Sequence, residues 1–129
     1  MAAVAVAVGM WVGAAFRAVA GRGRAGTKAV VFERVPAKGG VIVKKRVGLC
    51  RDEGGVFALL LVCPHLGCTP RVEEGFWQCP CHGSRFDFTG RRMHGPAPRG
   101  LTHLRVRRGA EGLIVELERE VPGAWRLKL

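Results

Sequence analysis

Four of the five cysteines in the chain lie within nineteen residues, and this crowding limits the fold more than any other feature of the sequence. Two histidines lie among them. The six residues are Cys63, His65, Cys68, Cys79, Cys81 and His82. Cysteine and histidine gathered in this way indicate a metal site. A chain of 129 residues has room for one small domain and an appendage, so we expect a single site.

Two short loops present the candidate ligands. Cys63-Pro-His65 and Cys79-Pro-Cys-His82 each offer a thiolate and an imidazole, with thirteen residues between His65 and Cys79. Two thiolates and two imidazoles suit a mixed-ligand [2Fe-2S] cluster, because neutral histidines reduce the net negative charge and raise the reduction potential. Structural zinc accepts the same donors, but it usually uses a close pair of cysteines followed by a pair of histidines. The mixed loops therefore favour the iron-sulfur cluster.

Each loop also carries one further thiol, Cys68 in the first and Cys81 in the second. If the loops converge on one site, these two thiols can reach disulfide distance. Such a bridge would indicate an oxidising compartment. The competing interpretation makes one of them a ligand in an all-cysteine site, which leaves His65 and His82 unexplained.

Short β-prone runs, punctuated by glycine and proline, fill the chain from residue 29 onward. Leu104 and Val106 alternate with two arginines, as a half-buried strand requires, and residues 58–62 are apolar throughout. No helical period lasts beyond one turn, so the fold is expected to be all-β and mainly antiparallel. The predicted strands are 29–34, 40–47, 56–62, 76–79, 101–107, 113–117 and 125–127.

Residues 1–20 are apolar apart from Arg17. A helix of about 20 residues just crosses a hydrocarbon core of ~30 Å, so this segment is predicted to be a transmembrane anchor. Ala18-Val19-Ala20 also has the form of a signal-peptidase site, although no positive region precedes the apolar run. Glycines and arginines make residues 21–28 a predicted flexible hinge. Residues 29–129 would then form the folded domain.

The chain is strongly basic, with 21 lysines and arginines against 10 acidic residues. Such a charge suits nucleic acid, anionic lipid or an acidic protein. The chain has no tyrosine and no nucleic-acid motif, so we expect no nucleic-acid partner. It also lacks a Ser-His-Asp set and a phosphate-binding loop, which leaves hydrolytic chemistry without candidate residues.

The two cysteine-histidine loops resemble the cluster-binding boxes of Rieske proteins. The boxes here are Cys63-Pro-His-Leu-Gly-Cys68 and Cys79-Pro-Cys-His-Gly-Ser84. The resemblance extends from about Ala29 to Glu118. It implies one [2Fe-2S] cluster, with Cys63 and Cys79 on the inner iron and His65 and His82 on the outer, solvent-facing iron. It also implies a disulfide between Cys68 and Cys81.

A third segment is similar to the proline loop of the same family, which covers the cluster. Its residues are Gly95, Pro96, Ala97 and Pro98. By this resemblance the loop should lie over the metal site.

The same resemblance implies the architecture and the closest relatives. The expected fold is a β-sandwich base with an inserted cluster-binding subdomain at about residues 63–98. Residues 101–107 and 113–117 return to the base. Ring-hydroxylating dioxygenases and their ferredoxins contain similar boxes, but their boxes lack the two disulfide cysteines. The chain is therefore more similar to the Rieske subunits of cytochrome bc-type complexes.

By this resemblance the expected function is one-electron transfer in a quinol:cytochrome c oxidoreductase, with no complete catalytic activity from this chain alone. His65 or His82 would face the quinol and accept its proton. The expected partners are a cytochrome b-type subunit and a c-type cytochrome. The anchor would hold the domain on the outer face of the cell membrane, although the positive residues after the apolar run favour the opposite orientation. The alternatives are the small Rieske subunit of an arsenite-oxidase-type molybdenum enzyme, and a soluble Rieske ferredoxin for an oxygenase.

The chain departs from the family pattern at Phe86. High-potential members have a tyrosine there, whose hydroxyl bonds to a cluster cysteine sulfur, whereas this chain reads Gly83-Ser84-Arg85-Phe86. Ser84 can still donate to a bridging sulfide, and such hydrogen bonds stabilise the reduced cluster. We therefore expect an intermediate potential, which favours a lower-potential quinol such as menaquinol.

Five other residues have a structural interpretation. Cys50 is expected to be a buried thiol, because free cysteine usually behaves as a small hydrophobe. Trp77 and Trp125 are expected in the core. His94, in a loop, and His103, on a strand with polar neighbours, are expected at the surface.

Overall fold

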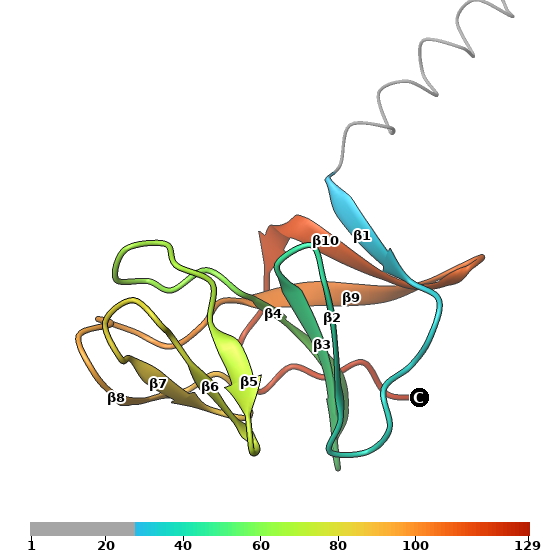
Figure 1. Ribbon diagram of the computed structural model, residues 1–129. Coiled ribbons are helices and arrows are strands. Elements are labelled where there is room, and N and C mark those ends of the chain that lie inside the picture. Colours follow the sequence, from blue (N-terminus) through green and yellow to red (C-terminus); the bar gives the residue numbers. More distant parts are fainter. Residues whose placement is uncertain (1–27) are drawn as a thin grey trace, which may run out of the picture.

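The computed structural model describes residues 28–129, which fold into ten strands and no helix (Figure 1). The predicted anchor at 1–20 and nearly all of the predicted hinge at 21–28 lie outside this range. Within residues 28–129 no helix is long and apolar enough to cross a membrane. The all-β fold class is confirmed for the described part of the chain.

The strands form two antiparallel sheets. A six-stranded sheet, the base, has the order β1-β10-β9-β4-β3-β2, and a four-stranded sheet has the order β5-β6-β7-β8. The bounds are β1 Ala29–Phe32, β2 Val41–Lys44, β3 Val47–Asp52, β4 Gly55–Leu60, β5 Arg71–Glu73, β6 Phe76–Gln78, β7 Arg85–Asp87, β8 Arg92–His94, β9 His103–Gly109 and β10 Gly112–Glu120. The small sheet is inserted between β4 and β9, which are neighbours in the base, so the predicted insertion is confirmed.

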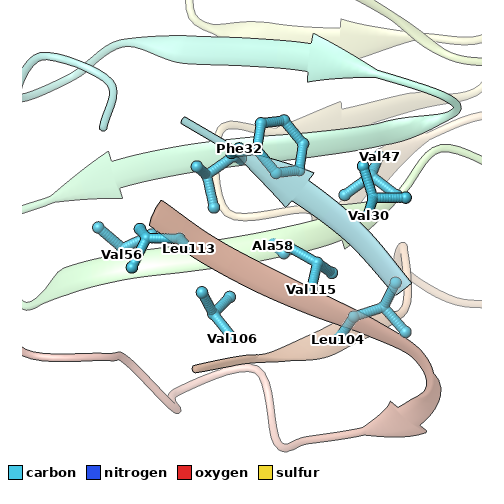
Figure 2. Packing of buried hydrophobic residues seen from close by; sticks show 10 residues of the cluster. Val30, Phe32, Val47, Val56, Ala58, Leu104, Val106, Leu113 and Val115 are labelled. Carbon is cyan, nitrogen blue, oxygen red and sulfur yellow. The ribbon is translucent and has the colours of Figure 1, made fainter. Parts of the chain in front are cut away.

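The base is one continuous sheet whose two halves share an apolar core. Only two residue pairs, Ala58↔Leu104 and Leu59↔His103, join β4 to β9, and the strands on either side contribute to the same cluster (Figure 2). All ten buried members of this cluster are aliphatic or aromatic: Val30, Phe32, Val47, Leu49, Val56, Ala58, Leu104, Val106, Leu113 and Val115. The expected sandwich therefore consists of a single curled sheet.

Two strand predictions in the base are wrong. The run 40–47 is not one strand but the end of a hairpin, in which β2 turns into β3 through Lys45 and Arg46. Both turn residues have positive φ angles, 48° and 60°. Tight turns of this kind usually carry Gly, Asn or Asp, so no residue type at these positions signals the turn. The run 125–127 is not a strand and forms only the isolated bridge Val56↔Leu127.

A second buried cluster joins the small sheet to the base. Trp77 on β6 is fully buried, as predicted, and its indole Nε1 donates to the Phe88 carbonyl at 3.3 Å. A Cβ atom on Gly48 of β3 would lie 2.8 Å from the Trp77 ring, so only glycine lets the ring pack there. The other members are Cys50, Phe57, Leu59, Leu61, Cys63, Cys79, Phe86, Ala97 and Leu101. The predicted burial of Cys50 is confirmed, while Trp125 is only half-buried against the base core.

Candidate metal centre

The two cysteine-histidine loops have the same backbone geometry. In the first, the Cys63 N–H donates to the Cys68 carbonyl at 2.7 Å and the Gly67 N–H donates back to the Cys63 carbonyl at 2.9 Å. In the second, the Cys79 N–H donates to the Ser84 carbonyl at 2.8 Å and the Gly83 N–H to the Cys79 carbonyl at 3.1 Å. Gly67 and Gly83 adopt nearly equal positive φ angles, 77° and 75°. The chain therefore builds one tight loop twice.

These loops bring the predicted ligands together in two pairs, the buried thiols of Cys63 and Cys79 and the more exposed imidazoles of His65 and His82. Cys63 and Cys79 are only 2% and 1% exposed and lie side by side. His65 is half-buried and His82 is exposed, and their ring centroids are 4.8 Å apart. Burial raises the pKa of the Cys63 thiol, and the neighbouring Cys79 acts in the same direction. A bound metal cation reverses this effect, because a coordinating thiol loses its proton outright.

One buried atom shows that the donor set suits a metal. His65 Nδ1 is buried and has no hydrogen-bond partner within residues 28–129. Buried polar atoms normally have a partner, and coordination to a metal would supply it. Two thiols and two imidazoles on paired loops also match the donors of a mixed-ligand [2Fe-2S] cluster. The residues present therefore fit this cofactor.

The disulfide is confirmed. Cys68 and Cys81 are joined by an S–S bond, with their Cα atoms 6.4 Å apart. The Sγ atoms of Cys68, Cys79 and Cys81 all lie within 4.8 Å of one another. Because two of these atoms are bonded to each other, this group places the disulfide against Cys79 and is not a ligand set. The free cysteines are Cys50, Cys63 and Cys79, so the all-cysteine alternative lacks its thiols.

Ser84 holds the proline loop, residues 95–98, against the second ligand loop. The buried Ser84 Oγ accepts a hydrogen bond of 3.0 Å from the Ala97 N–H, which leaves the hydroxyl hydrogen of Ser84 free to donate. A Cβ atom on Gly95 would lie 2.5 Å from the Ser84 Cα, so glycine is required there. Phe86 is fully buried in the same cluster as Cys63 and Cys79.

The prolines of this loop are its outer residues. Pro96 and Pro98 are exposed, and Ala97 between them is only 1% exposed. Ala97 belongs to the same buried cluster as the two free thiols of the ligand loops. The resemblance predicts a loop that covers the cluster. The loop does lie against the second ligand loop, but its inward contact is made by Ala97 and not by Pro96 or Pro98.

Two arginines that no sequence motif indicated form hydrogen bonds to the loops around the ligands. The Arg46 guanidinium, on the β2–β3 turn, donates to the Gly67 carbonyl at 2.6 Å. The Arg92 guanidinium donates to the Gly95 carbonyl at 2.7 Å. Arg46 lies 21 residues from its partner, and no local pattern in the sequence indicates such a contact.

The prediction for His103 is wrong, while that for His94 is confirmed. His94 is exposed, but His103 is only 7% exposed. The turn after β7 covers it, because His103 Nε2 forms a 2.7 Å hydrogen bond with the Thr89 carbonyl and the ring stacks on Phe57 with centroids 5.6 Å apart. Desolvation lowers the pKa of His103. The alternation along β9 predicted that one face of this strand is exposed to solvent. The inserted subdomain covers that face at the end of the strand where His103 lies.

Comparison with known proteins identifies the family. The Rieske [2Fe-2S] domain model matches residues 24–105. The ubiquinol-cytochrome c reductase iron-sulfur subunit of Rhodobacter capsulatus is 50% identical over 54 residues, which cover 39% of this chain and 28% of that protein. The mitochondrial cytochrome b-c1 complex subunit Rieske of Neurospora crassa is 54% identical over 46 residues, or 33% of this chain and 20% of that protein. The chain thus spans less than a third of these relatives.

A solved structure agrees on the fold. A chain of a hyperthermophilic respiratory Complex III aligns with a TM-score of 0.53 and 24% identity, covering 82% of this chain and 98% of its own length. At this identity the likeness shows the fold alone. The family match, by contrast, covers more than half of the sequence. The chain therefore belongs to the Rieske [2Fe-2S] family and is an electron-transfer protein that carries one [2Fe-2S] cluster.

Proposed function

We propose that this chain is the iron-sulfur subunit of a membrane quinol:cytochrome c oxidoreductase, which takes an electron from quinol and passes it to a c-type cytochrome. The observation that carries this proposal is the pairing of an exposed imidazole, His82, and a half-buried one, His65, with two buried thiols. The Cys68–Cys81 disulfide supports it, since the oxygenase systems of the family lack these cysteines. The matched reductase subunits support it as well.

In this proposal the four side chains divide into an inner and an outer pair. Cys63 and Cys79 hold the inner iron, and His65 and His82 hold the outer one. The bound cluster supplies one-electron redox chemistry, at a potential raised by its neutral imidazole ligands. His65 would coordinate through its buried Nδ1, which leaves Nε2 to accept a hydrogen bond and then a proton from the quinol hydroxyl. Ala97 of the proline loop packs in the same buried cluster as the two thiols, and the disulfide ties the two ligand loops together.

The proposed roles of the N-terminal segments and of the domain are those that the resemblance to the family implies. Residues 1–20 would anchor the chain in the cell membrane, and residues 21–28 would let the domain move between a cytochrome b-type subunit and a c-type cytochrome on the outer face. Residues 29–129 would form the Rieske domain, with the cluster-binding subdomain at about 63–98. Phe86, which has no hydroxyl, supports an intermediate potential and a lower-potential quinol such as menaquinol.

A second candidate is the small Rieske subunit of an arsenite-oxidase-type molybdenum enzyme. Disulfide-bearing Rieske domains occur there too, and phenylalanine at position 86 suits a subunit that only relays electrons. A soluble ferredoxin for an oxygenase has less support, because the disulfide argues against it.

Purification of the native complex from the source membrane tests the proposal. We expect the full chain to copurify with b-type and c-type haem and with quinol-dependent reduction of a c-type cytochrome. His82→Gln should abolish this activity, because it removes a ligand, whereas His94→Gln serves as the matched control, since His94 is equally exposed and is not among the proposed ligands. Copurification with molybdenum and without b haem would refute the proposal in favour of the second candidate.

A further inference from the structure

A cavity of about 510 Å³ lies on the seam between the inserted subdomain and the base, apart from the metal centre. The turn between β7 and β8 forms one side, and the segment after the proline loop forms another. The end of β10 closes the third side. The polar side chains that line it are Thr89, Arg91, Arg92, Arg99, Thr102, His103 and Glu120. None of the predicted cluster ligands lines it.

The backbone holds two arginine-bearing segments close together at this cavity. The Leu101 N–H donates to the Gly90 carbonyl at 2.8 Å, which joins the segment Gly90-Arg91-Arg92 to the segment Arg99-Gly100. A Cβ atom on Gly100 would lie 2.6 Å from the Gly90 carbonyl oxygen, so the close approach requires glycine. The two segments that carry Arg91, Arg92 and Arg99 therefore lie side by side because glycine at position 100 allows their backbones to touch, and all three arginines line the cavity.

The turn that carries Arg91 is also fixed by a side chain. Asp87 Oδ1 accepts hydrogen bonds of 2.9 Å from the Thr89 and Arg91 N–H groups and one of 2.7 Å from the Thr89 hydroxyl. Asp87 Oδ1 is therefore occupied by the turn itself, and Asp87 forms no ion pair with an arginine of the cavity within residues 28–129. These hydrogen bonds fix the backbone of the turn before any ligand binds, which lowers the entropy cost of binding.

The arginines at the cavity form no ion pair within residues 28–129, and a single carboxylate, Glu120, lies among them. Arginines elsewhere form ion pairs: Arg105 and Arg107 with Glu116, and Arg126 with Asp52. Arg91, Arg92 and Arg99 form none, and only one guanidinium nitrogen of Arg92 is used, toward Gly95. With Glu120 counted and His103 neutral, the lining carries a net charge of about +2. A site with a net positive charge attracts anions.

From this arrangement we propose that the cavity binds the phosphate group of an anionic ligand. Guanidinium groups bind phosphate oxygens with two parallel N–H donors each, which point charges on lysine cannot match. A phosphate dianion would balance the net charge of the lining. The same chemistry is offered by free phosphate or a soluble phosphate ester and by the headgroup of an anionic lipid. The site does not depend on the electron-transfer role proposed above.

Calorimetric titration of the full-length, cluster-loaded protein in detergent tests this. The probes are inorganic phosphate and a short-chain phosphatidylglycerol, with short-chain phosphatidylcholine as the lipid of no net charge. Arg91→Gln combined with Arg99→Gln should weaken binding roughly a hundredfold, or about tenfold for each guanidinium removed. The matched control is Arg34→Gln combined with Arg119→Gln, two exposed arginines outside the cavity whose substitution changes the net charge equally.

Each outcome decides the question. Tighter binding of inorganic phosphate than of phosphatidylglycerol supports the site with a soluble ligand, and the reverse supports it with a lipid headgroup. Equal weakening in both double variants means that net charge alone attracts the anion, which overturns the proposal. Absence of binding by both anionic probes overturns it too. Retained iron and an unchanged Tm in the Arg91 and Arg99 variant establish that any weakening is local.

Discussion

The base and the inserted subdomain are built on different principles. The base has strands of 4 to 9 residues around a core of aliphatic and aromatic side chains. Every strand of the subdomain has 3 residues, and β5 and β8 are exposed along their whole length. Strands this short cannot bury enough apolar surface to be stable alone. Hydrophobic burial stabilises the base. In the subdomain, much of the stability must come from the disulfide and from the bound metal cluster.

The two regions meet at a few specific contacts. Trp77 packs on Gly48, Arg46 reaches the first ligand loop, and His103 bonds to the turn after β7. In each contact a residue of the base meets a loop or strand of the subdomain. The comparison therefore predicts that damage to the subdomain stays local, while damage to the base core lowers the stability of the whole domain.

Substitution of a proposed ligand should have the largest effect. In Cys79→Ser we expect no bound cluster and fast amide hydrogen exchange in β5–β8, with β9 and β10 still protected, because the base core contains none of the ligands. Iron and acid-labile sulfide analysis with hydrogen exchange measures both. Cys50→Ala is the matched control, since Cys50 is an equally buried thiol that belongs to β3 of the base and to neither ligand loop. Full iron content in Cys79→Ser would contradict the ligand assignment.

A cavity in the base core should come next. Leu49 is fully buried between the strands of the base, and Leu49→Ala should lower the free energy of unfolding by about 2 to 5 kcal/mol. Chemical denaturation followed by circular dichroism measures this change. Val43→Ala, at a side chain that is 52% exposed on the neighbouring β2, should change it by no more than about 0.5 kcal/mol. A large loss of stability that is confined to the small sheet would contradict the proposed difference between the base and the subdomain.

Removing the disulfide should have a smaller effect that is local. Cys68→Ala combined with Cys81→Ala should cost roughly 2 to 4 kcal/mol, because the bond closes a loop of only 13 residues in the unfolded chain. The cost is smaller while the bound cluster still ties the two loops together. We also expect faster release of iron to a chelator. Two free thiols at these positions in the oxidised wild-type protein would contradict the bond.

The pH dependence of stability should reveal the contact at His103. Burial lowers its pKa below the ordinary value of 6.5, with Arg126 acting in the same direction and the Thr89 carbonyl and Asp87 opposing. Between the lowered pKa and 6.5 the unfolded chain binds more protons, so the stability from this group is complete above pH 6.5 and is lost as the pH falls below it.

In His103→Gln this part of the pH slope should vanish, as measured by denaturation at several values between about pH 7.5 and 5, a range that spans the ordinary histidine pKa. His94→Gln, which removes an exposed histidine, should keep the wild-type slope. Equal slopes in wild type and His103→Gln would show that the imidazole is not buried in solution.

The sequence predicted the cofactor and the disulfide better than the framework around them. Cysteine and histidine at fixed spacing are local signals with a chemical meaning, so the two loops could be identified directly, and the resemblance to Rieske proteins implied the disulfide. The strands β5, β7 and β8 were missed because each has only 3 residues with polar ones at both ends, unlike the aromatic β6, and so carries no period. The strand β3 was missed as well, because Gly48 and the charged residues at its end interrupt its apolar run. Arg46 and His103 were missed for a different reason. Their roles depend on segments that are distant in sequence and become neighbours only through the insertion.

The smallest expected effect is at Phe86, where the subdomain departs from the family's high-potential pattern. Phe86 is fully buried and packs in the same cluster as Cys63 and Cys79, so Phe86→Tyr should add one hydrogen bond to a cluster sulfur. A donor to sulfur favours the more negative, reduced cluster, so the reduction potential should rise. A charge-assisted bond contributes about 1.5 to 3 kcal/mol, and only the difference between the redox states shifts the potential.

Protein-film voltammetry at one pH compares Phe86→Tyr with three other proteins: wild type, Ser84→Ala and Phe76→Tyr. Ser84→Ala should lower the potential, because it removes the buried hydroxyl whose hydrogen is free to donate. Phe76→Tyr is the matched control, since Phe76 is half-buried on β6 outside the cluster that contains the thiols. A potential in Phe86→Tyr at or below that of wild type would mean that the ring does not point toward sulfur. The new hydroxyl would then be buried without a partner at a cost of about 1 to 3 kcal/mol, and the argument for a lower-potential quinol would lose its support.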